Sequence, residues 1–261
     1  MTDETPDLLR PRRKGIYLLP NLFTTGCLFG GFFAVVAAID KHFDKAGIAI
    51  FIAMVCDTLD GRTARLTRTE SAFGKEYDSL ADMVAFGLAP AIVAYQWGVV
   101  RITEYGHSWG RFGWLACFFY AAAGALRLAR FNARAATADK RYFEGLPSPS
   151  AAAIVAAFVW FCSDWREPRL DGLIAAFVVT ASAGALMVSN FGYPSFKQFN
   201  LDRRIRFVYM LLVPVVFVAI AVDPPTMLLA MFGTYALSAP VLWIGRRLRR
   251  LFRGAPGAGA A

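Results

Sequence analysis

Charged residues are scarce in this chain, and the residues that build zinc sites and disulfide frameworks are scarcer still. Only 18% of the 261 residues are charged, and there are two histidines and four cysteines. The cysteines fall within or at the ends of apolar runs at irregular spacing, which predicts neither a zinc site nor a disulfide framework. Basic residues are dispersed among loops without a recognition module, so we expect no nucleic-acid partner.

Long apolar runs are abundant instead. Hydrophobic residues make up 57% of the chain and aromatic residues 15%, more than a soluble core of this size needs. The runs predict eight membrane-spanning helices, at about residues 17–39, 46–66, 77–99, 112–132, 146–163, 171–189, 205–222 and 226–245. The sequence therefore predicts an all-α integral membrane protein with a single polytopic domain, residues 1–261. We expect the low-complexity tail, 254–261, to be disordered.

The distribution of Lys and Arg predicts the orientation in the lipid bilayer. Of the 28 basic residues, 22 lie in the N-terminal tail, in the segments 62–75, 127–141 and 197–206, and in the C-terminal tail. By the positive-inside rule both termini are cytoplasmic, which requires an even number of spans. We therefore expect a protein of the inner (cytoplasmic) cell membrane.

Four aspartates interrupt the apolar pattern in the second and third expected spans: Asp57, Asp60, Asp78 and Asp82. An ionised Asp at the centre of a membrane helix is unfavourable by roughly 2.5–3.5 kcal/mol on insertion scales. Such groups need partners, and cations are the natural ones. We therefore expect these two helices to face the interior of the bundle.

Helical geometry predicts two polar faces that the short segment 66–73 sets against each other. The first face combines carboxylates, small residues and an arginine within an arc of about 140°: Asp57, Asp60, Gly61, Ala64 and Arg65. The second is a stripe of residues spaced four apart: Gly74, Asp78 and Asp82.

A cage of oxygens without His or Cys favours hard divalent cations such as Mg²⁺ or Mn²⁺. Four carboxylates carry enough charge for two such ions, which would remain available to a phosphate or pyrophosphate. Gly61, Ala64 and Gly74 would let a ligand approach the backbone, and Arg65 would bind a phosphate. Interior aspartates can also carry protons or cations, and small residues can be packing positions. Eight residues in register favour the metal–phosphate site.

The same residues resemble the complete signature of the CDP-alcohol phosphotransferases. The pattern is Asp57-x-x-Asp60-Gly61-x-x-Ala64-Arg65, then eight residues to Gly74, three to Asp78 and three to Asp82. Surrounding segments resemble the phosphatidylserine synthase branch of this family: 19–24, 78–82, 125–132 and 145–149. The resemblance covers about residues 15–190, and implies a six-helix catalytic core followed by two C-terminal helices and a homodimer.

The resemblance also implies a reaction, in which the hydroxyl of L-serine attacks CDP-diacylglycerol to give phosphatidylserine and CMP. Asp57, Asp60 and Asp78 would be ligands of two divalent metal ions, and Asp82 would be the general base and also touch a metal. The residues that would contact CDP-diacylglycerol are Asn21, Thr24, Asp60, Gly61, Ala64, Arg65 and Gly74.

The acceptor serine carries a carboxylate, so its site should offer an arginine. Arg127 and Arg130 lie three apart on one helix face, and Asn132 follows. We expect these residues to bind serine or phosphate, although arginines at the end of a span can also extend to anionic headgroups. Ser148, between Pro147 and Pro149, is expected to cap the fifth span.

Three alternatives remain open at this point. Another family member would use glycerol 3-phosphate, inositol phosphate or choline, and a phosphorylated acceptor would demand a denser basic site. An intramembrane prenyltransferase normally places its two Asp motifs in separate halves of the chain, whereas here Asp60 and Asp78 are 18 residues apart. A cation transporter would have no use for Arg65 beside the carboxylates.

Overall fold

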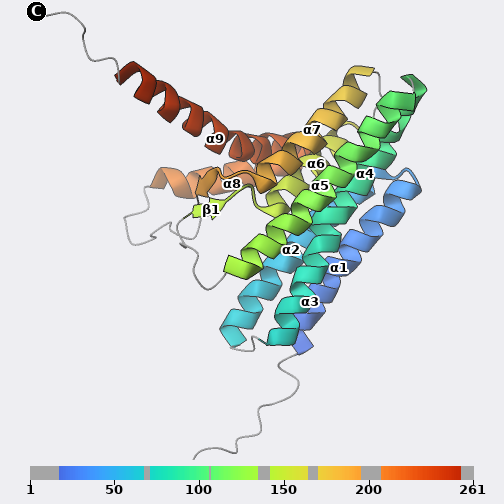
Figure 1. Ribbon diagram of the computed structural model, residues 1–261. Helices are drawn as coiled ribbons and strands as arrows, with labels where there is room; N and C mark the ends of the chain where they lie inside the picture. The colour runs from blue at the N-terminus through green and yellow to red at the C-terminus, as the bar shows by residue number, and fades with distance from the viewer. Residues whose placement is uncertain are drawn as a thin grey trace, which may run out of the picture.

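The computed structural model describes residues 18–67, 71–105, 107–134, 142–163, 170–194 and 207–253. The N-terminal tail lies outside the described residues. The tail 254–261, the one segment for which we expected disorder, also lies outside them. Helices dominate the described part of the chain (Figure 1). The elements in order are α1 (Leu18–Ile39), α2 (Phe43–Thr67), α3 (Ala72–Asp82), the π-helical η2 (Met83–Leu88), α4 (Ala89–Trp97), the 3₁₀-helical η3 (Val99–Tyr105), α5 (His107–Arg134), β1 (Tyr142–Glu144), α6 (Ser148–Phe161), α7 (Leu170–Val188), β2 (Gly192–Pro194), α8 (Phe207–Val222) and α9 (Pro224–Arg253).

The helices follow the eight expected spans, with α3, η2 and α4 forming one continuous rod over the third. Five of the described helical segments are long and apolar enough to cross a membrane, and α6 is a shorter apolar helix. The prediction of an all-α membrane protein is confirmed. The third span begins earlier than expected, because the Ser71 hydroxyl caps it by accepting a hydrogen bond from the Gly74 amide at 2.9 Å.

The helix α6 lies at the centre of the bundle. Buried residues occur all around it, and it contacts α2, α4, α7 and α9. A helix that is apolar on every side has no face for water or headgroups, so its position in the interior follows from its composition. The residues that make this possible are mostly alanines, which let the neighbouring helices approach closely.

The first helix packs tightly against the rod that carries the aspartates. A Cβ atom at Gly31 would lie 2.7 Å from the Cα of Ala85 in η2, so no side chain fits there. The other neighbour of α1 is α2, and the three elements run side by side in Figure 1. Glycine at position 31 is therefore a condition for bringing α1 against the π-helical turn.

The π-helical turn directly follows Asp82, and the sequence explains it. Pro90, near the start of α4, has no amide hydrogen to donate to the carbonyl of Phe86. That carbonyl instead accepts a hydrogen bond from the hydroxyl of Tyr120 in α5, at 3.0 Å. The local widening of the helix thus connects α5 to the rod one turn beyond Asp82.

Two short strands join the ends of α5 and α7. The strands β1 and β2 pair antiparallel, with Glu144 opposite Gly192. Gly145 follows with φ of +78°, and a Cβ atom there would lie 2.3 Å from the carbonyl oxygen of Met187. Only glycine tolerates both this positive φ and the lack of room for a Cβ atom. Gly145 therefore fixes the direction of the chain after Glu144.

The last helix, α9, is attached to the core through the strand β2 and through α6. It runs obliquely to the helices α1 to α5 in Figure 1 and packs against α6. The buried hydroxyl of Tyr193 in β2 donates a hydrogen bond to the carbonyl of Ala236, at 2.8 Å. Burial and the neighbouring Tyr235 raise the pKa of Tyr193 to about 12, so the phenol keeps the proton that it donates.

Gly31→Ala should destabilise the protein, because the new methyl group would press on the backbone of η2. Overpacking of this kind costs about 1–3 kcal/mol, which corresponds to a fall of several degrees in the midpoint of thermal unfolding in detergent. Gly233→Ala is the matched control, since nothing lies within 4 Å of a Cβ atom there. An equal midpoint for both variants would contradict the close packing of α1 on η2.

Candidate active site

The two polar faces expected from the sequence meet where α2 and α3 lie side by side. Asp57, Asp78 and Asp82 each offer a carboxylate oxygen, and these atoms all lie within 4.8 Å of one another. The side chain of Asp57 lies next to that of Asp82, and the side chain of Asp60 lies next to that of Asp78. All four carboxylates therefore belong to one cluster, as the helical spacing predicted.

The cluster fits a hard divalent cation. The Oδ1 atom of Asp82 is buried and has no hydrogen-bond partner among the described residues. A buried carboxylate oxygen without a donor is costly unless a cation faces it. The donor set contains oxygen atoms only, which suits Mg²⁺ or Mn²⁺ better than zinc or copper.

Thr24 in α1 contacts this cluster directly. It is buried, and its hydroxyl donates a hydrogen bond to Oδ2 of Asp60, which is itself 6% exposed. The sequence predicted Thr24 as a polar contact for the nucleotide. In the structure its hydroxyl orients a carboxylate of the cluster, so Thr24 connects α1 to Asp60.

The small residues and Arg65 lie along the more exposed side of the cluster. The Nε atom of Arg65 donates a hydrogen bond to the carbonyl of Gly61 at 2.7 Å, so the side chain folds back along α2. A Cβ atom at Gly74 would lie 3.1 Å from the Ser71 hydroxyl and 3.7 Å from Oδ1 of Asn21. Asn21 and Gly74 are thus neighbours, and Ala64 is half-buried on the face of α2 that carries Arg65.

Arg127 approaches the cluster from α5. Its charge interacts with Asp82, and its Nη1 atom donates a hydrogen bond to the hydroxyl of Ser148 at 3.0 Å. The prediction that Ser148 caps its helix is wrong. Pro147 occupies the N-cap position of α6 without a side-chain hydrogen bond, and the Ser148 hydroxyl accepts from Arg127 instead.

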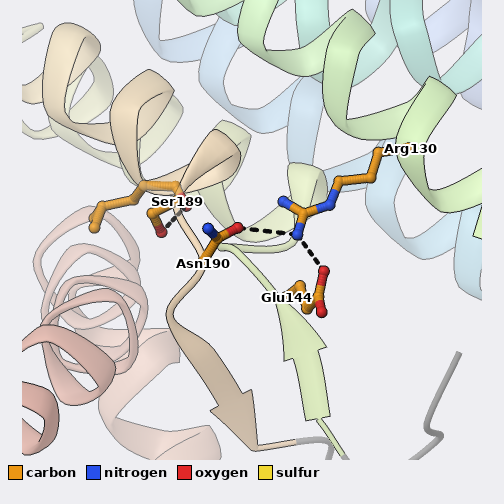
Figure 2. Close-up of polar contacts among 5 residues, drawn as sticks. Arg130, Glu144, Ser189 and Asn190 are labelled. Atoms are coloured by element: carbon orange, nitrogen blue, oxygen red, sulfur yellow. Dashed lines mark hydrogen bonds and ion pairs between the residues drawn. The ribbon is translucent and has the colours of Figure 1, made fainter.

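Asn132 and Arg130 extend from α5 in different directions. The amide nitrogen of Asn132 donates a hydrogen bond to the hydroxyl of Ser79 at 2.9 Å. This bond connects α5 to α3 beside Asp78. Arg130 instead pairs with Glu144 in β1, and its Nη2 atom also donates to Oδ1 of Asn190 at 3.0 Å (Figure 2).

Four residues of this region were not predicted from the sequence as partners of the arginines: Glu144, Ser148, Asn190 and Tyr235. Tyr235 lies in α9 near Arg127, so the last helix reaches this side of the site. Asn190 is 60 residues from Arg130. No helical or strand periodicity links positions so far apart. For Glu144 the sequence held a weak local signal, because Gly145, Pro147 and Pro149 follow it and indicate a turn before the next helix.

Comparison with known proteins gives consistent results. The family model for CDP-alcohol phosphatidyltransferase matches residues 17–189. A CDP-diacylglycerol--serine O-phosphatidyltransferase of Helicobacter pylori is 35% identical over 91% of this chain and 95% of its own length. A protein of the same name from Saccharomyces cerevisiae is 36% identical over 49% of this chain and 48% of its own length. An archaetidylserine synthase of Methanothermobacter thermautotrophicus is 33% identical over 67% of this chain and 69% of its own length.

The family match spans α1 to α7 and includes every aspartate of the cluster. It ends before α8 and α9, whereas the similarity to the Helicobacter pylori protein extends over nearly the whole chain. The resemblance inferred from the signature between Asp57 and Asp82 is therefore confirmed. The chain belongs to the CDP-alcohol phosphatidyltransferase family.

Proposed function

We propose that this protein transfers the phosphatidyl group of CDP-diacylglycerol to the hydroxyl of L-serine, giving phosphatidylserine and CMP. The observation that carries the proposal is the convergence of Asp57, Asp78 and Asp82 between α2 and α3. Serine as the acceptor is supported by the similar proteins, since the names of all three relatives include serine.

The four aspartates are the proposed metal site. Asp57, Asp60 and Asp78 would hold two divalent cations, Mg²⁺ or Mn²⁺, with Asp82 as a further ligand. When bound, these cations neutralise the diphosphate and stabilise charge on the leaving group. Thr24 supports the arrangement because its hydrogen bond keeps one oxygen of Asp60 turned toward α1.

Asp82 is the proposed general base. A serine hydroxyl is a poor nucleophile unless its proton is removed as it attacks. As the bond between the serine oxygen and the β-phosphorus forms, the bond from that phosphorus to CMP breaks. The proton passes to Asp82, and CMP leaves with the electron pair. The positive charge of Arg127 lies near the carboxylate that takes part in this step.

The nucleotide side of the site lies along α2 and the start of α3. Gly61, Ala64 and Gly74 border the cytidylyl group, where the absence of bulky side chains leaves room for it. Arg65 is exposed and can turn from the Gly61 carbonyl toward a phosphate. Asn21, beside Gly74, adds a polar contact from α1.

The acceptor side of the site lies at the end of α5. Arg127 and Arg130 bind the serine carboxylate or a substrate phosphate. Asn132 contributes through its hydrogen bond to Ser79, which holds α5 beside the aspartates of α3. The distribution of basic residues favours a position of this end of α5, and of both termini, on the cytoplasmic side of the inner membrane. The family resemblance further favours a homodimer.

A panel of acceptor alcohols tests the proposed reaction. Purified protein in detergent with CDP-diacylglycerol and Mg²⁺ or Mn²⁺ should release CMP when serine is added. Glycerol 3-phosphate, inositol phosphate and choline should give little release, because the described residues of the acceptor side offer two arginines with one acidic neighbour. A preference for glycerol 3-phosphate would refute the assignment of serine.

Asp82→Asn should remove the general base while leaving the shape of the site unchanged. General-base catalysis contributes about 10²–10⁴-fold, so kcat should fall by that factor while binding of CDP-diacylglycerol is largely retained. Asp171→Asn, at an exposed position at the start of α7, is the matched control and should behave as the wild type. Equal losses of binding and turnover would make Asp82 chiefly a metal ligand.

Direct metal binding tests the aspartate cluster without relying on turnover. Electron paramagnetic resonance of added Mn²⁺ should show bound metal in the wild type and in Asp171→Asn. Asp57→Asn and Asp78→Asn should each bind Mn²⁺ at least about tenfold more weakly, since each removes a charged ligand. Unchanged Mn²⁺ affinity in both variants would exclude this cluster as the metal site.

A further inference from the structure

We propose that Glu144 is an acceptor-specificity residue, whose carboxylate receives the ammonium group of an amino-acid acceptor while Arg130 beside it receives the carboxylate. This inference rests on the proposed function, because it concerns the acceptor of that same reaction. It adds a negatively charged residue to the acceptor side. Arg127 and Arg130 supply positive charge alone, which cannot bind an ammonium group.

The position of Glu144 follows from two contacts along α5. Arg127 interacts with Asp82 and hydrogen-bonds to Ser148, at the start of α6. Arg130 lies three residues further on, about 4.5 Å along the helix axis, and pairs with Glu144. Both ends of the segment 144–148 are thus held by arginines on one helix face. Glu144 thus lies beside the turn of α5 that follows Arg127.

The backbone places Glu144 with little freedom. Its strand pairs with β2, and the amide of Gly145 donates a hydrogen bond to the Phe191 carbonyl at 2.9 Å. The amide of Leu146 donates to the Leu186 carbonyl at 2.9 Å. The left-handed Gly145 between them excludes other residues. The segment therefore fixes the backbone of Glu144 beside Arg130, so the carboxylate stays within reach of the guanidinium and of a small acceptor.

The pair contributes little to stability but remains open to a ligand. The side chains of Arg130 and Glu144 are 29% and 54% exposed. Water screens ion pairs that are exposed to this degree, so their charges remain available to other partners. The Nη2 atom of Arg130 donates to both Glu144 and Asn190, as Figure 2 shows. Asn190 can therefore keep the guanidinium in place when the carboxylate of Glu144 turns to a ligand.

Charge complementarity then selects the acceptor. Free serine carries one positive and one negative group within a few bonds of its hydroxyl, and the Arg130–Glu144 pair offers one partner for each. A phosphorylated alcohol would bring its negative charge against Glu144. Choline would leave Arg130 without an anion. An adjacent pair of opposite charges therefore favours a zwitterion over both alternatives.

Two analogues of serine separate the roles of the pair: 3-hydroxypropionate lacks the ammonium group, and ethanolamine lacks the carboxylate. Each is measured as a competitive inhibitor of phosphatidylserine formation from labelled serine, because both analogues carry a hydroxyl that can itself release CMP. Glu144→Gln should raise the KM for serine and the inhibition constant of ethanolamine by about tenfold or more, the usual effect of losing a charged hydrogen bond. The inhibition constant of 3-hydroxypropionate should change less than about twofold, within the range of surface substitutions.

Arg130→Gln should give the reverse pattern, weakening 3-hydroxypropionate and sparing ethanolamine. Glu76→Gln, exposed on α3, is the control with an unchanged KM. If Glu144→Gln does not fold, Glu144→Asp keeps the charge but retracts it, and its KM should rise less steeply. An unchanged KM in the Glu144 variant, or equal weakening of both analogues, overturns the inference. A wild-type protein that releases no CMP with serine instead contradicts the proposed function.

Discussion

The electrostatic cost of four carboxylates between the helices α2 and α3 is the constraint on which the rest of the structure depends. Asp57, Asp78 and Asp82 approach one another within 4.8 Å, and one oxygen of Asp82 is buried without a donor among the described residues. Such an arrangement is unfavourable in the absence of compensating positive charge. The protein offers part of that charge through Arg127, and the oxygen-only donor set suits a divalent cation for the remainder.

The neighbouring helices hold the carboxylates in place. From one side α1 approaches the rod closely at Gly31, and its Thr24 hydroxyl binds Asp60. From the other side α5 is connected by the bond from Asn132 to Ser79 and by the bond from Tyr120 to Phe86. These contacts fall on both sides of Asp82 along the rod. A site built on packed helices in this way keeps its charged groups at fixed separations, as catalysis of phosphoryl transfer requires.

The acceptor side depends on a different kind of support. Its arginines come from α5, but their partners come from β1, the start of α6 and the segment between α7 and β2. The two-stranded sheet brings these segments together, and Tyr193 attaches the sheet to α9. The helix α9, outside the family match, is thereby joined to the core and contributes Tyr235 near Arg127. The part of the chain that lies beyond the family match thus reaches the proposed acceptor side of the site.

Much of the fold and of the aspartate cluster could be predicted from the sequence, because both depend on local spacing. Apolar runs must form helices in a bilayer, and residues four apart share a helix face, so the spacing of Gly74, Asp78 and Asp82 was enough to place them on one stripe. The π-helical turn was not predicted. It arises because the carbonyl released by Pro90 finds its partner in Tyr120, 34 residues from Phe86.

The aspartate cluster and the proposed acceptor side differ in the same way: the first follows from local spacing, and the second from contacts between distant residues. The sequence by itself determined the membrane class, the family and the four carboxylates, since these depend on hydrophobic length and on one continuous motif of 26 positions. Only the tertiary structure decided that Thr24 binds Asp60, that Ser148 accepts from Arg127, and that Glu144 pairs with Arg130. These contacts join residues on separate elements, and their formation depends on how whole helices pack, which no local periodicity encodes.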